Sequence, residues 1–171
     1  MSKLHPQTLA IRASKEQTPF NEHQQALFLT SSFMADSAAD AAAIFAKTKE
    51  GYTYSRTANP TIAAFQKRIA ALENAEAGIA TATGMAAIQA ALLTFLSAGD
   101  HLVSSRSLFG TTAGLLSGHI ARFGIEITFV SQTDVSEWEK AIRPNTKMLF
   151  LETPSNPLNE VADLEKLAKL A

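Results

Sequence analysis

Two tyrosines and an arginine stand close together in the segment GYTYSRTANPT, residues 51–61. They are Tyr52 and Tyr54, the only tyrosines of the chain, and Arg56. A phenol and a guanidinium that converge can bind an anion such as phosphate, because both donate hydrogen bonds and the guanidinium is positively charged. A surface turn whose rings cover a neighbouring apolar patch fits the same spacing. The segment alone leaves both interpretations open.

The segment TATGMAA, residues 81–87, could also contact an anion. Gly84 lets the backbone approach a ligand closely, and the N–H groups of Gly84 and Met85 open a helix whose N-terminus attracts negative charge. Packing of this helix against a strand would equally require a small residue. The G-x-G-x-x-G spacing is absent, which leaves a nicotinamide-binding domain only weakly supported.

Two later segments add an aromatic ring and polar side chains. In SRSLFGTT, Phe109 is either a core residue or a ring that lies flat on a planar ligand. In LETPSNP, two prolines restrict the backbone and would pre-position Glu152 and Asn156. Asn156 could instead satisfy backbone groups of its own loop.

The elements that must position these segments alternate between strands and helices. Strands are predicted at residues 78–83, 101–105, 125–130 and 146–152. Helices are predicted at residues 36–51, ended by Gly51, and at 60–73, capped by Asn59, where Ile62, Phe65, Ile69 and Leu72 form one apolar face. A helix at residues 84–96 is apolar nearly all round and should therefore be buried. Further helices are predicted at residues 111–124, ended by Gly124, at 134–142, capped at its start, and at 163–171. This alternation predicts an α/β fold with a mostly parallel sheet and helices on both faces. Ligands of such sheets bind beyond the carboxyl ends of the strands, where residues 81–85, 105–112 and 151–157 fall.

Composition excludes several classes of protein. Of 171 residues, 46% are hydrophobic and 18% are charged, which is typical of a soluble globular protein. A net charge of -1 and the lack of a basic cluster argue against nucleic-acid binding, and the lack of cysteine excludes disulfides and thiolate chemistry. No histidine has metal-ligand spacing, so no metal site is expected. No apolar run has the length of a signal peptide or a membrane span, which predicts a cytoplasmic protein without membrane contact.

Four motifs occur in an order that resembles one enzyme family. YSRTANPT, ATGMAAI, SLFGTT and LETPSNPL are similar to the cystathionine γ-synthase family, the pyridoxal-phosphate (PLP) enzymes of cysteine and methionine metabolism, and closest to its O-succinylhomoserine sulfhydrylase branch. The resemblance implies an aspartate-aminotransferase-like fold (fold type I) that is truncated here. It also implies an arm and short helix at residues 1–55 that contact a neighbouring subunit, followed at 56–171 by the first part of the large PLP-binding domain.

The resemblance also implies roles for single residues. Tyr54 and Arg56 match the pair that binds the PLP phosphate of the adjacent subunit in a dimer of dimers, and Gly84 and Met85 match backbone amides that complete the phosphate cup. Phe109 falls where a ring stacks on the pyridine. Most family members have tyrosine there, and phenylalanine favours the sulfhydrylase branch.

The remaining implied site residues lie in the last motif or beyond the chain. Asn156 matches a residue near the 3-oxygen of the cofactor, and Glu152 one that supports the site. The Schiff-base lysine and the aspartate that pairs with the pyridine nitrogen are expected beyond residue 171, so no catalytic residue is assigned within the chain.

The implied activity is γ-replacement on O-succinylhomoserine or O-acetylhomoserine with sulfide, which gives homocysteine for methionine biosynthesis. The alternatives are a cystathionine γ-synthase or γ-lyase of the same family, or an inactive truncated chain that only binds or assembles.

Overall fold

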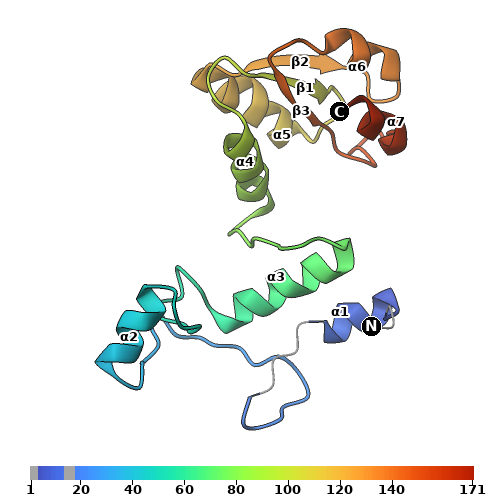
Figure 1. Cartoon of the computed structure of the whole chain (residues 1–171). Coiled ribbons are helices and arrows are strands. Elements are labelled where there is room, and N and C mark those ends of the chain that lie inside the picture. The colour runs from blue at the N-terminus through green and yellow to red at the C-terminus, as the bar shows by residue number, and fades with distance from the viewer. Residues whose placement is uncertain (1–3, 14–17) are drawn as a thin grey trace. The chain divides into compact units, whose positions relative to one another are not determined.

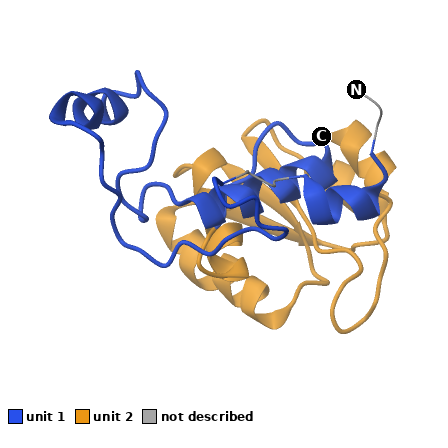
Figure 2. Ribbon diagram, turned by 90° about the horizontal axis from the view of Figure 1, so that it is seen from below, with its two compact units in different colours: residues 1–80 blue, residues 81–171 orange. Residues whose placement is uncertain are grey.

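The computed structural model describes residues 4–13 and 18–171. The chain forms two compact units, residues 1–80 and 81–171 (Figure 2). The predicted division near residue 55 stays a prediction. No helix in the described part of the chain is long and apolar enough to cross a membrane.

The described residues of the first unit form three helices: α1 (Pro6–Arg12), α2 (Ala38–Phe45) and α3 (Pro60–Glu73) (Figure 1). Asn59 caps α3 as predicted, since its side chain accepts a hydrogen bond from the N–H of Thr61 at 2.8 Å and Pro60 occupies the first turn. Helix α1 was not predicted, because its short polar sequence lacks an apolar stripe.

Two predictions for the first unit are wrong in detail. Helix α2 ends at Phe45 and not at Gly51, because Lys47 already adopts a left-handed backbone with φ 58°. The predicted apolar face of α3 is largely exposed, with Phe65 at 56% and Ile62 at 42%, while Ala64 and Ala70 are buried. Helical periodicity gives the face of a helix but not whether a neighbour covers it.

The second unit is a three-stranded parallel sheet with helices packed against it (Figure 1). Its elements in chain order are α4 (Gly84–Phe95), β1 (His101–Ser105), α5 (Gly110–Gly114), a π-helical segment (Leu115–Ile120), a 3-10 turn (Ala121–Phe123), β2 (Glu126–Val130), α6 (Val135–Ala141), β3 (Thr146–Phe150) and α7 (Leu164–Leu170). The strand order is β2-β1-β3. Gly124 ends the helical run at φ 78°, and Asp134 caps α6, both as predicted.

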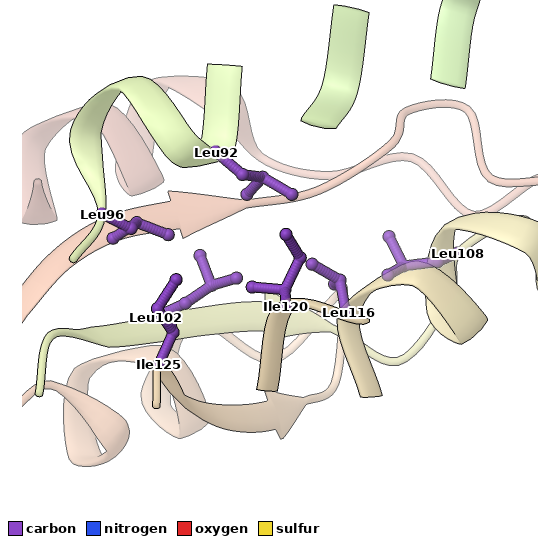
Figure 3. Close-up of a cluster of buried hydrophobic side chains, with 7 residues drawn as sticks. All are labelled: Leu92, Leu96, Leu102, Leu108, Leu116, Ile120 and Ile125. Atoms are coloured by element: carbon purple, nitrogen blue, oxygen red, sulfur yellow. The ribbon is translucent and has the colours of Figure 1, made fainter. Parts of the chain in front are cut away.

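The central strand β1 separates two hydrophobic clusters. Leu102 packs with Leu92, Leu116 and Ile120 on one face of the sheet (Figure 3). The next residue, Val103, packs with Trp138 of α6 and with Leu167 of α7 in a second cluster. Successive strand residues point to opposite faces, so helices cover both faces of the sheet, as predicted.

Two further predictions, for residues 78–83 and for the helix that follows them, are corrected. Residues 78–83 form no strand, since a strand needs a hydrogen-bonded neighbour and the described strands do not pair with this segment. Helix α4 is not fully buried: Leu92 is 0% exposed, but Phe95 is 68% exposed. Only one side of α4 packs on the sheet, and no described residue covers the other.

Candidate functional site

The carboxyl ends of the three parallel strands meet at one edge of the sheet, because β1 pairs in parallel with both neighbours. Strand β1 ends at Ser105, β2 at Val130 and β3 at Phe150. The segments that follow β1 and β3 carry Phe109 and Glu152. Sheet topology therefore brings two of the predicted segments to one edge.

Glu152 connects these two segments directly. One carboxylate oxygen, Oε2, accepts a hydrogen bond from the backbone N–H of Phe109 at 2.8 Å. The other, Oε1, accepts one from the hydroxyl of Thr112 at 2.5 Å, and Thr112 is 1% exposed. Both oxygens are thus engaged by the first turn of α5. Phe109 remains 48% exposed, so its ring can contact a planar ligand.

Asn156 lies in the exposed loop after β3. Ser155 and Glu160 close this loop: the N–H of Ser155 donates to the carbonyl of Glu160 at 2.9 Å, and the N–H of Glu160 donates to Oγ of Ser155 at 3.0 Å. Within the described residues, the side chain of Asn156 makes no hydrogen bond to the loop. The interpretation that Asn156 satisfies the loop backbone is therefore not supported, and its amide faces solvent.

Gly84 and Met85 form the first turn of α4. Thr83 caps the helix by accepting a hydrogen bond from the N–H of Ala86 at 3.0 Å. The first N–H groups of a helix have no acceptor within it, so those of Gly84 and Met85 can bind an external anion. A Cβ added at Gly84 would meet nothing within 4 Å. Packing does not require glycine here, and the space beside it is open to a ligand.

Tyr54 and Arg56 belong to the first unit. The guanidinium carbon of Arg56 lies 5.5 Å from the centroid of the Tyr54 ring, and both side chains are exposed. The segment pairs with the preceding chain through a bridge between Ser32 and Tyr54 and a hydrogen bond from the N–H of Ser55 to the carbonyl of Ser31 at 2.9 Å. This pairing holds the segment in place, with the guanidinium of Arg56 over the face of the Tyr54 ring at the surface of the first unit.

The structure brings together Phe109, Glu152 and the Asn156 loop. Gly84 and Met85 form no hydrogen bond with that group among the described residues, and Tyr54 and Arg56 lie in the other unit. Sequence reasoning missed Thr112, although this residue closes the SLFGTT motif. A hydroxyl three residues after an aromatic at the ligand edge is a weak sequence signal, and only its contact with Glu152 reveals its importance.

Known proteins match nearly the whole chain. A family model described as the Cys/Met metabolism PLP-dependent enzymes matches residues 7–171. The O-succinylhomoserine sulfhydrylase of Pseudomonas aeruginosa is 50% identical over 164 residues, which are 96% of this chain and 41% of that protein. An L-methionine γ-lyase of Fusobacterium nucleatum is 42% identical over 96% of this chain and 42% of its own length.

A solved structure shows the same fold. The crystal structure of an O-acetylhomoserine (thiol)-lyase from Campylobacter jejuni superposes with a TM-score of 0.90 at 33% identity, over 98% of this chain and 41% of that one. That protein carries a pyridoxyl group on a lysine. The fold is therefore the fold type I of PLP-dependent enzymes, and the chain spans about two fifths of the length of the relatives it matches.

Proposed function

Since the chain belongs to the PLP-dependent enzymes of cysteine and methionine metabolism, we propose that it carries one part of a γ-replacement site. The proposed reaction joins sulfide to O-succinylhomoserine or O-acetylhomoserine, releases the acyl group as a carboxylate and gives homocysteine. The observation that carries the proposal is Phe109, an exposed ring without a hydroxyl, fixed at the carboxyl edge of the sheet by Glu152.

The described residues fit pyridoxal phosphate. The open space beside Gly84 and the available N–H groups of Gly84 and Met85 suit a phosphate, which a helix N-terminus stabilises. Tyr54 and Arg56 add a hydroxyl and a charged donor, and we infer that they serve the site of a neighbouring subunit in a homo-oligomer. Charge-assisted hydrogen bonds of this kind contribute about 1.5–3 kcal/mol each.

The cofactor would supply an electron sink that makes the protons beside the substrate amine removable. Phe109 would stack on its ring, which excludes water from one face, and Asn156 would contact its 3-oxygen. Phe109 has no hydroxyl, so no proton moves at this position. Both oxygens of Glu152 already accept hydrogen bonds, so Glu152 orients Phe109 and Thr112 and does not act as a free base.

A chimaera tests this function. In it, the present sequence replaces the matching segment of the Pseudomonas aeruginosa relative, and the products from O-succinylhomoserine are measured with sulfide and with cysteine. We expect homocysteine from sulfide as the main product. Cystathionine as the main product would instead indicate a cystathionine γ-synthase.

A γ-lyase is the second candidate, supported by the 42% identity to a methionine γ-lyase. The same chimaera distinguishes it, because a lyase releases methanethiol from L-methionine without an added nucleophile. An unmodified parent enzyme, assayed in parallel, shows whether a change arises from the exchanged segment.

A further inference from the structure

Glu160 ends the loop that begins at Glu152, and its carboxylate reaches the segment on which Phe109 lies. Oε2 of Glu160 accepts a hydrogen bond from the hydroxyl of Ser107. Glu152, at the other end of the loop, accepts hydrogen bonds from Phe109 and Thr112. Two carboxylates therefore hold the same segment: Glu160 at Ser107, before Phe109 in the chain, and Glu152 at Phe109 itself and at Thr112.

Buried polar groups fix the backbone of Glu160. Its carbonyl accepts a hydrogen bond from Nε2 of Gln132 at 2.7 Å. Oε1 of Gln132 accepts one from the hydroxyl of Ser105, the last residue of β1, at 2.9 Å. The same Ser105 oxygen accepts the N–H of Ser107 at 2.9 Å. Gln132 and Ser105 are 1% and 0% exposed, so these bonds are shielded from water.

We propose that Glu160 is a positioning residue of this site. Together with Glu152 it latches the loop of residues 151–163 onto the segment of residues 105–112. The latch sets the position of Asn156 relative to the Phe109 ring. Its role toward the cofactor rests on the proposed function, whereas its mechanical role does not.

The position of Asn156 depends on how the two ends of its loop are held. Asn156 makes no hydrogen bond of its own to the loop within the described residues, and the loop is exposed around it. Its position is therefore set by the anchored ends, Glu152 and Glu160. Loss of the Glu160 carboxylate removes the bond between this loop and Ser107, while the Glu160 carbonyl keeps its bond to Gln132.

Amide hydrogen exchange of the 171-residue chain, measured by NMR without cofactor, tests the latch. In Glu160→Ala we expect the Phe109 amide to exchange roughly tenfold faster, because the segment that carries Phe109 loses its bond from Ser107 to Glu160 and can move more freely relative to Glu152. The amide of Val103, at the centre of β1, should keep its rate. Glu160→Gln retains an acceptor oxygen and should restore slow exchange at Phe109.

Matched variants complete the experiment. Ser107→Ala removes the donor of the same bond, so the double variant Ser107→Ala/Glu160→Ala should exchange no faster at Phe109 than Glu160→Ala alone. Glu165→Ala removes an exposed carboxylate that pairs with Lys169 on α7 and should change nothing. Unchanged exchange at Phe109 in Glu160→Ala would overturn the latch. Equal acceleration at Phe109 and Val103, or no rescue by glutamine, would overturn it as well.

Equilibrium dialysis with pyridoxal phosphate separates the two proposals. We expect Glu160→Ala to bind the cofactor more weakly than the wild-type chain, with an unchanged midpoint of urea unfolding. A wild-type chain that binds no pyridoxal phosphate would contradict the proposed function of this chain, while the exchange rates would still decide the latch.

Discussion

The carboxylate of Glu152 accepts a hydrogen bond from the backbone N–H of Phe109, 43 residues earlier in the chain, at 2.8 Å. This bond joins the segment that follows β3 to the start of α5. Every residue except proline supplies this backbone donor, so at residue 109 the bond depends mainly on the acceptor, Glu152. Through this bond the side chain of Glu152 positions the residue that begins α5.

Loss of this carboxylate should destabilise the second unit. Glu152→Ala leaves the N–H of Phe109 and the buried hydroxyl of Thr112 without their acceptor, and we expect the free energy of unfolding to fall by about 1–3 kcal/mol. Urea titration followed by the fluorescence of Trp138 measures it. Glu139→Ala, on the exposed side of α6, should change it by less than about 0.5 kcal/mol. Equal midpoints for both variants would contradict the prediction.

Removal of the guanidinium beside Tyr54 should weaken cofactor retention. In the chimaera, Arg56→Ala is expected to raise the dissociation constant for pyridoxal phosphate roughly tenfold or more, because the phosphate loses a bidentate charged donor. Dialysis followed by absorbance gives the constant. Arg122→Ala, exposed in the 3-10 turn, serves as the control. Retention that is the same in both variants would argue against an anion site at residues 54–56.

Borohydride reduction of the 171-residue chain with pyridoxal phosphate should label no single lysine stoichiometrically, and the chain should show no turnover. In the described part of the chain, no lysine lies on the three ligand-edge segments; Lys3 and Lys15 lie outside it. Asp40 raises the pKa of Lys49 through a hydrogen bond, and Asp163 does the same for the pKa of Lys166, so both amines stay protonated and poorly nucleophilic.

Peptide mapping decides this prediction. We expect scattered, substoichiometric labels on exposed lysines. Full labelling of one lysine, together with activity on O-succinylhomoserine, would show that these residues suffice for the reaction.

His101 should make stability depend on pH. Burial, and next the charge of Arg143, lower the pKa of this side chain below 6.5, while Glu126 opposes the shift. The folded state therefore binds a proton less readily than the unfolded state. Stability should be full above about pH 6.5 and fall as the pH decreases from there toward the lower folded-state pKa.

Urea midpoints between about pH 5 and about pH 8 test the role of His101. His101→Gln should lose this part of the pH dependence, although it also loses hydrogen bonds to Thr128 and Thr146. His119→Gln, at an exposed position, should keep the wild-type profile. A His101→Gln profile parallel to that of the wild type would show that another group titrates.

The sequence predicted correctly those parts of the fold that depend only on residues close together in the chain. Asn59 and Asp134 cap helices, and Gly124 ends one, because each acts on its own backbone or on residues a turn away. Residues 78–83 have strand-like composition, yet a strand forms only where another strand pairs with it. The exposure of Phe65 likewise depends on covering partners that its own helix does not specify.

The residues of the candidate site also fall into two groups, those that the sequence pattern could place and those that only long-range contacts reveal. Phe109, Glu152 and Asn156 could be placed at one sheet edge from the strand pattern. Thr112 and Glu160 could not, because their importance comes from contacts across 40 and 53 residues of chain, respectively. Whether Gly84 is needed for packing was also open from sequence, and the open space around it shows that packing does not require glycine there.

The alternation of Leu102 and Val103 along β1 has a consequence for cooperativity. Each of the two hydrophobic clusters is built on one face of the same strand, so neither can persist once β1 leaves the sheet. The second unit should therefore unfold in a single all-or-none step. Trp138, the only tryptophan of the chain, reports on one cluster alone, yet its fluorescence should give the same midpoint as a probe of the other.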